Sequence, residues 1–154
     1  MAGLFDLKLD LLKKEMDNIQ GHIRAYGQVQ FTIKGWAITI YSGFIFFAVK
    51  EKEPVFLGLC AITVLLFWLL DAIFKSIQKV YIDRAIKIES FLQELPVTKG
   101  KQAFKDFPVP NTESRFEQLT PWEKVEGALS AAFTFQLALL YIVMLAVTGY
   151  LIVK

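Results

Sequence analysis

Four polar side chains lie inside or at the edge of apolar stretches of this chain, where a polar group needs a partner. Asp71 ends the run FWLLDA, and Thr134, Gln136 and Thr148 interrupt the apolar stretch near the C-terminus. For Asp71 three roles are open: a solvated acid, an ion pair with Lys75, or a bond to a neighbouring helix. For Gln136 the alternatives are interhelical bonding and pore lining. A polar stripe that Gln136 shared with the two threonines would favour a pore.

A second set of residues combines positive charge with aromatic rings in the segment after Asp71. Cations attract phosphates and aromatic faces stack on bases, so this segment is a candidate site for a cyclic or linear oligonucleotide. The segment also carries acids, and a solvated stalk with buried aromatic residues is an equal alternative. The candidate ligand-binding residues are Lys79, Arg84, Lys87, Lys101, Phe104, Lys105 and Phe107.

The sequence contains no motif for catalysis or metal binding. Its one histidine, His22, and one cysteine, Cys60, cannot supply a dedicated zinc site within one chain. It has no glycine-rich phosphate loop, no GxSxG elbow and no Cys/His arrangement for nucleophilic catalysis. We therefore expect a protein that is not an enzyme and that needs no metal or cofactor.

Three apolar runs, at 35–49, 54–74 and 129–153, must position the polar residues. A hydrocarbon core ~30 Å thick needs ~20 mostly apolar helical residues to cross it. The alternative is a soluble protein that buries these runs. With 14 Phe and a positive mean hydropathy, a chain of 154 residues has too little polar surface to do so. The sequence therefore predicts an all-α integral membrane protein with three transmembrane helices.

Amphipathic helices are predicted on both sides of the expected transmembrane hairpin, 34–74. Residues 1–33 carry a heptad, which can pack on another helix or lie on the inner leaflet, and we favour packing. A second helical pattern continues beyond the hairpin until Pro96 ends it. Residues 1–33 and 72–128 would then form a helical cytoplasmic stalk, in which 75–120 is the cytoplasmic helix and loop. The apolar residues are Phe5, Leu9, Leu12, Met16, Ile19, Ile23 and Tyr26 in the heptad, and Ile77, Tyr81, Ala85, Ile88, Leu92 and Leu95 in the second pattern.

Local signals predict where two of the helices begin or break. Thr120 is a candidate N-cap, Pro121 suits the first helical position, and Glu123 completes a capping box. We expect one helix to run from there through the third span, so that 121–154 is a single element. Before the first span we expect a break near Gly27, because glycine weakens a helix.

The basic residues predict an orientation. Five Lys or Arg precede the first span and nine lie in 71–128, whereas the turn at 50–53 has two and the C-terminus has one. By the positive-inside rule the N-terminus and the middle segment are cytoplasmic, and the C-terminus is outside. Three spans are too few to enclose a polar path. The apolar seams on separate helices also need partners, so we expect a homo-oligomer. Gly127 and Ala131 could allow close helix approach around its axis.

Two segments, QFTIKGWAIT (30–39) and FWLLDAIFKSIQKVY (67–81), carry a resemblance to known proteins. They resemble the K-G-W and F-W-x-L-D-A signatures of a group of small bacterial membrane proteins, in which these motifs open the first span and close the second. The resemblance covers residues 28–82. The chain departs from the group after Phe74, with Lys75 and Ser76 where the group often has an aromatic and basic pair, and it adds a third span.

The general plan is similar to that of membrane effectors of bacterial antiphage systems, including the channel component of Hailong-type systems. This resemblance implies an oligomeric effector or ion channel of the bacterial inner membrane, gated by a nucleotide signal and acting in antiphage defence, with a soluble defence partner as a further expectation. The rival hypothesis is a structural membrane anchor or adaptor that recruits a soluble protein through the heptad helix and stalk. A subunit of a larger transporter is a third hypothesis.

Overall fold

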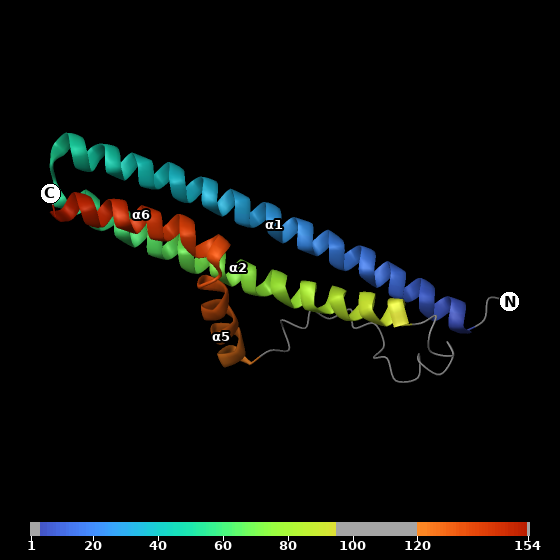
Figure 1. The fold of residues 1–154 in the computed structure, drawn as a ribbon. Helices are drawn as coiled ribbons and strands as arrows, with labels where there is room; N and C mark the ends of the chain where they lie inside the picture. The colour runs from blue at the N-terminus through green and yellow to red at the C-terminus, as the bar shows by residue number, and fades with distance from the viewer. Residues whose placement is uncertain (1–3, 95–119, 154) are drawn as a thin grey trace. The chain divides into compact units, whose positions relative to one another are not determined.

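The computed structural model describes residues 4–94 and 120–153, and every element in these ranges is an α-helix (Figure 1). The helices are α1 (Leu4–Glu51), α2 (Pro54–Glu94), α5 (Pro121–Ala132) and α6 (Phe135–Val153). The predicted all-α class is thereby confirmed. By length and composition α1 and α2 can each cross a membrane, and α5 with α6 would provide a third crossing if the bent pair acts as one span.

A tight turn joins α1 to α2. Lys52 has a left-handed backbone (φ 56°), and its N–H donates to the carbonyl of Ala48 at 3.1 Å, which closes the last turn of α1. Pro54, which has no N–H to leave unpaired, is the first residue of α2. The two helices therefore leave the turn as an antiparallel hairpin.

The chain divides into two compact units, which are described separately. Unit 1 contains Met1–Ala25 and Ile77–Thr120, and unit 2 contains Tyr26–Ser76 and Pro121–Lys154. Helices α1 and α2 each contribute residues to both units.

In unit 1 the first part of α1 packs on the last part of α2 along an apolar seam. Leu12, Ile19 and Ile88 are buried at its centre. Residues of the α1 heptad thus meet the apolar pattern of α2 within one chain. This differs from our expectation that the two seams need partner chains. The residues packed around the buried centre are Met16, Ile23, Tyr81, Ala85, Phe91 and Leu92.

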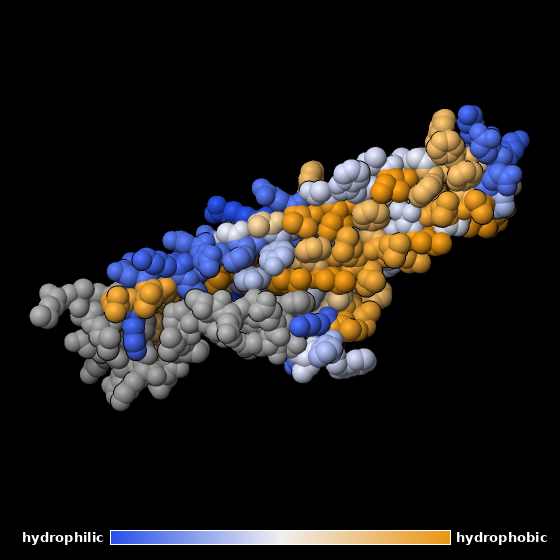
Figure 2. Space-filling view, turned by 180° about the vertical axis from the view of Figure 1, so that it is seen from behind, coloured by the Kyte–Doolittle hydropathy of each residue, from blue (hydrophilic) through white to orange (hydrophobic). Residues whose placement is uncertain are grey.

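In unit 2 the second part of α1, the first part of α2 and α6 pack side by side around one apolar core (Figure 1). The outer surface of these helices is also apolar: Phe31, for example, is 80% exposed. Figure 2 shows this broad hydrophobic surface. So large an exposed apolar area is typical of a surface that meets lipid. The buried core residues are Ala37, Tyr41, Cys60, Val64, Leu137, Tyr141 and Met144.

Helix α1 continues through Gly27, where we expected a break. A glycine in a helix costs about 1 kcal/mol relative to alanine, and neighbouring contacts oppose this cost. In unit 1 the Gln78 side-chain amide donates to the carbonyl of Ile23 at 2.9 Å. In unit 2 the Tyr26 and Phe74 rings lie 6.3 Å apart. Packing of the residues just before the glycine on α2 therefore outweighs the local preference.

Helices α5 and α6 are separate, although we expected one helix over 121–154. The chain turns at Phe133 and Thr134, and the two helices are bent by 69°. The Thr134 N–H donates to the Ala131 carbonyl at 3.0 Å and closes α5. The Thr134 carbonyl then accepts the N–H groups of Leu137 and Ala138, both at 2.9 Å, and opens α6.

We expect Ile88→Ala to destabilise unit 1 by about 2–5 kcal/mol, because it leaves a cavity in the seam. The measurement is amide hydrogen exchange in α1 and α2, where protection should fall around the seam. Ile86 is the matched control, because it is 57% exposed on the same helix while Ile88 is 0% exposed. Ile86→Ala should change protection little, and equal effects of the two variants would contradict the packing.

Candidate functional site

The carboxylate of Asp71 joins three helices of unit 2. Asp71 lies on α2 and is 0% exposed. The Lys34 Nζ of α1 is 2.7 Å from Asp71 Oδ2, and the Tyr141 hydroxyl of α6 donates to the same oxygen at 3.2 Å. Of the three roles left open for Asp71, these contacts correspond to the bond with neighbouring helices. We call Lys34, Asp71 and Tyr141 the charged cluster.

The geometry of the hairpin explains why Lys34 and Asp71 meet. Lys34 lies 17 residues before Glu51, the last residue of α1, and Asp71 lies 17 residues after Pro54, the first residue of α2. Antiparallel helices that leave a tight turn bring such residues to the same level, roughly 25 Å from the turn. In a hydrocarbon core ~30 Å thick, that level is close to the far boundary.

The contacts of the charged cluster offset the free-energy cost of burying the charge of the Asp71 carboxylate. A buried ion pair offsets this cost only when its geometry is good and its remaining atoms are hydrogen-bonded. Lys34 keeps 27% of its side chain exposed, so its ammonium retains access to the surface. Asp71 Oδ1, in contrast, is buried and has no hydrogen-bond partner among the described residues. The carboxylate therefore has capacity for one further hydrogen bond.

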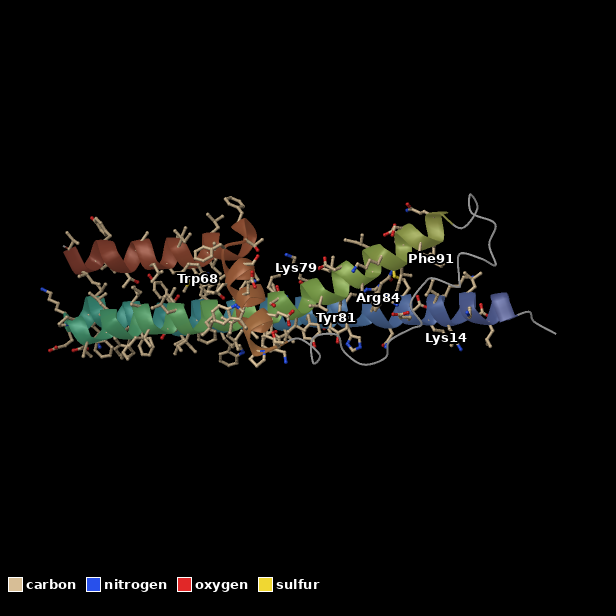
Figure 3. All side chains as sticks on the ribbon, turned by 90° about the horizontal axis from the view of Figure 1, so that it is seen from below. Lys14, Trp68, Lys79, Tyr81, Arg84 and Phe91 are labelled. Carbon is tan, nitrogen blue, oxygen red and sulfur yellow. The ribbon has the colours of Figure 1, made fainter. Side chains whose placement is uncertain are left out.

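Trp68, labelled in Figure 3, connects the charged cluster to the turn between α5 and α6 through three contacts. Its ring is nearly parallel to that of Tyr141, with centroids 6.1 Å apart and an interplanar angle of 11°. It also meets the Phe133 ring edge-on at 6.2 Å. The indole N–H donates to the carbonyl of Ala132 at 3.0 Å, which satisfies an acceptor that the end of α5 leaves open. One side chain thus contacts both the residue that holds Asp71 and the end of α5.

A second polar cluster in unit 2 joins α1 to α6. The Tyr41 hydroxyl donates to the Met144 carbonyl at 2.8 Å and lies 3.1 Å from the Thr148 hydroxyl. Thr148 also donates to the Met144 carbonyl, at 3.0 Å, and is buried. The hydroxyl of Thr148 is therefore satisfied within the chain.

The structure does not bring the predicted pore residues together. Thr134 is exposed at the start of α6. Thr148 lies fourteen residues later on α6 and is buried, a separation of about 21 Å along the helix. The side chain of Gln136 lies outside what the structure describes, so its predicted role stays a prediction.

The predicted ligand-binding residues are divided. Lys79 and Lys87 are exposed on the part of α2 that belongs to unit 1. Arg84 on the same segment donates from Nε and Nη2 to the two carboxylate oxygens of Glu15 on α1, at 2.9 and 3.2 Å. Figure 3 shows Arg84 on the side of α2 that faces α1. Arg84 therefore joins the two helices, whereas the two lysines present their charges to solvent. Lys101, Phe104, Lys105 and Phe107 lie outside the described residues.

The small residues of α5 lie in contacts within the chain. A methyl group at Gly127 would place its Cβ 2.8 Å from the Ser76 Oγ of α2. Ala128 and Ala131 are buried. We predicted that Gly127 and Ala131 allow helices of different chains to approach closely. In the structure, Gly127 allows α5 to approach α2 of the same chain.

Lys34, Trp68 and Tyr141 complete the site, although the sequence had suggested only Asp71. Lys34 belongs to the K-G-W motif and Trp68 to the F-W-x-L-D-A motif. Lys34 and Asp71 lie equally far from the turn, and this spacing could have predicted from the sequence that the two residues pair. Nothing in the sequence distinguishes Tyr141 from the other aromatic residues of its run. Among the described residues, no group of three or more His, Cys, Asp or Glu could hold a metal ion.

We expect Lys34→Met and Asp71→Leu each to lower the thermal unfolding midpoint of the full chain in detergent. Each change leaves a polar group of the cluster unpaired, at a cost of about 1–3 kcal/mol. The double variant should recover much of the loss, because no buried charge remains. Lys79→Met, which removes an exposed lysine, is the control and should leave the midpoint unchanged. Losses that simply add in the double variant would contradict a coupled pair.

We expect Gly127→Ala to loosen α5, because the added methyl meets Ser76. The measurement is hydrogen exchange of the α5 amides, which should become faster. Ser76→Ala should restore protection in the double variant, since the next nearest atom, Ser76 Cβ, would be 3.9 Å away. Gly149→Ala is the control, because nothing lies within 4 Å of a methyl there and it gains the same helix propensity. Identical behaviour of the two glycine variants would contradict the contact.

Comparisons of the chain with protein-family models, with curated proteins and with solved structures find no match. The functional proposal therefore rests on the contacts of the charged cluster, on the apolar surface of unit 2 and on the sequence motifs.

Proposed function

We propose that the protein is an oligomeric effector of the bacterial inner membrane that conducts ions in response to a nucleotide signal and acts in antiphage defence. The observation that carries the proposal is the charged cluster. Ionisable residues within apolar spans are costly, and in membrane proteins they mark ion paths, proton relays or gates. Lys34 and Asp71 also belong to the two motifs by which the chain resembles a group of small bacterial membrane proteins.

The packing of unit 2 supports a path between chains rather than within one. Ala37, Tyr41, Cys60, Val64 and Tyr141 are among the side chains that fill the centre of the three packed helices. An ion crossing the described part of one chain would have to displace this core. A conducting path therefore requires several chains around a common axis, and an oligomer is part of the proposal.

A shift of the spans would act on the charged cluster first. Its three residues come from three helices, so any sliding of α6 or α1 against α2 must lengthen one of its contacts. Asp71 Oδ1 has no hydrogen-bond partner among the described residues. A rearranged state could supply a donor to this oxygen. A nucleotide favours that state only if it binds it more tightly than the resting state.

The ligand would bind the cytoplasmic stalk. Lys79 and Lys87 offer exposed charges on α2, and Lys101, Phe104, Lys105 and Phe107 would add further cations and stacking faces. Arg84 has a different part in this proposal. Because it is held by Glu15, it would keep α1 and α2 together while the lysines meet phosphate.

A membrane anchor or adaptor is the second candidate, and one observation favours it. The core of the three packed helices is apolar, and Thr148, a predicted pore residue, bonds within the chain. A protein that only anchors a partner needs no polar axis. In this case unit 1 would be the docking platform for a soluble protein.

The test is ion flux through liposomes that contain the full chain, with and without a panel of cyclic and linear oligonucleotides. Mass measurement in detergent reports the assembly. We expect flux with one nucleotide class only. Lys79→Gln and Lys87→Gln should each raise the nucleotide concentration needed by roughly tenfold, the effect of losing one charge-assisted contact. Lys50→Gln, at the exposed turn, is the matched control and should not change it.

One outcome would contradict the channel, and two others would contradict the assigned ligand site. A well-assembled oligomer that neither binds nucleotide nor conducts would favour the adaptor. Flux that ignores nucleotides, or that responds equally in the lysine variants and the wild-type protein, would exclude the assigned ligand site.

A further inference from the structure

Helix α5 has one apolar face that packs and another that does not. The packed face carries Gly127 against Ser76 of α2, with Ala128 and Ala131 buried beside it. The end of the helix is held by the hydrogen bond from Trp68 to the Ala132 carbonyl. These contacts lie within unit 2 and fix which way α5 is turned about its own axis.

The unpacked face is a stripe of large apolar side chains. Trp122, Val125 and Leu129 recur at spacings of three and four residues and therefore share one side of the helix. Phe133 follows in the turn just beyond the end of α5 and adds to the stripe. All four are exposed, Trp122 by 75% and Phe133 by 74%. In Figure 2 the hydrophobic surface of the packed helices continues onto α5. Within unit 2 the stripe is thus continuous with the surface that meets lipid.

The angle between the helices sets how α5 would lie in a bilayer. Helix α6 has 19 residues, almost all apolar, a length of about 28 Å that suits a single crossing. Transmembrane helices tilt by ~20° on average from the bilayer normal. Because α5 is bent by 69° from α6, it would lie closer to the membrane plane than to the normal.

The depth of α5 follows from the side chain that holds it. Trp68 lies one turn before Asp71 on α2, where the apolar run 54–74 ends. An indole at this level is typical of the membrane–water interface. The end of α5, bonded to Trp68, is therefore at the headgroup boundary rather than in the middle of the bilayer.

We infer that α5 is an interfacial helix whose stripe inserts into the boundary between headgroups and acyl chains, in the leaflet where α6 begins. Its partner is the lipid bilayer itself. The charged residues of α5 are two acids, Glu123 and Glu126, and one base, Lys124, so binding relies on apolar burial rather than on anionic headgroups. The inference does not depend on the proposed channel.

The experiment places a spin label on the full chain in phosphatidylcholine nanodiscs, with Cys60→Ala as the background. Leu129→Cys labels the stripe, and Ser130→Cys is the matched control, because it is the next residue, exposed on the side of Glu126. Molecular oxygen concentrates in the bilayer and a nickel chelate stays in water. We expect the ratio of oxygen to nickel accessibility to be several-fold higher at 129 than at 130.

Two results would overturn the inference. If residue 129 is as accessible to nickel as residue 130, the stripe faces water. If residue 129 is shielded from both reagents and its spectrum is broadened by a second label, a second copy of the chain covers the stripe. Val125→Cys repeats the measurement on the same stripe should Leu129→Cys fail to fold.

Discussion

The ion pair between Lys34 and Asp71 is the interaction on which the arrangement of unit 2 depends. The Oδ2 oxygen of Asp71 receives one contact from α1 and one from α6, so one carboxylate joins three apolar helical segments. Apolar contacts between such helices are hardly directional, and lipid can replace them at little cost. A buried charge is different, because it has few acceptable partners. The pair therefore selects one register among many that would bury similar apolar area.

The Trp68 indole extends this constraint to α5. It packs on Tyr141 and bonds to the last residue of α5, so the position of the tyrosine and the end of the short helix are linked through one rigid ring. Unit 1 uses another device, the paired hydrogen bonds of Arg84 with Glu15 beside an apolar seam. Polar contacts thus specify the helix register of both units, and apolar contacts provide most of their buried surface area.

Periodicity and composition predicted the helical class, because heptad spacing and long apolar runs report local geometry directly, but they wrongly predicted a break near Gly27 and one helix over 121–154. They predicted the seam residues Leu12, Ile19 and Ile88 without showing that these would meet in one chain. They missed the turn at Phe133 and Thr134, next to which the Trp68 indole bonds to the carbonyl of Ala132, 64 residues later in the sequence. The roles of Lys34 and Tyr141 were also missed, since a tertiary contact has no local signature. Asp71 was found because a lone acid in an apolar run is conspicuous.

The equal spacing of Lys34 and Asp71 from the turn has a consequence for the membrane as well as for the protein. The length of the hairpin between the charged turn and the charged cluster is fixed, and it sets the thickness of the hydrocarbon core that the hairpin matches. A bilayer much thicker than this length would draw one charged end inward, and a thinner one would expose apolar side chains to water. Hydrophobic mismatch of this kind would strain the contact between Lys34 and Asp71. The lipid composition around the protein would therefore affect the stability of its helix register.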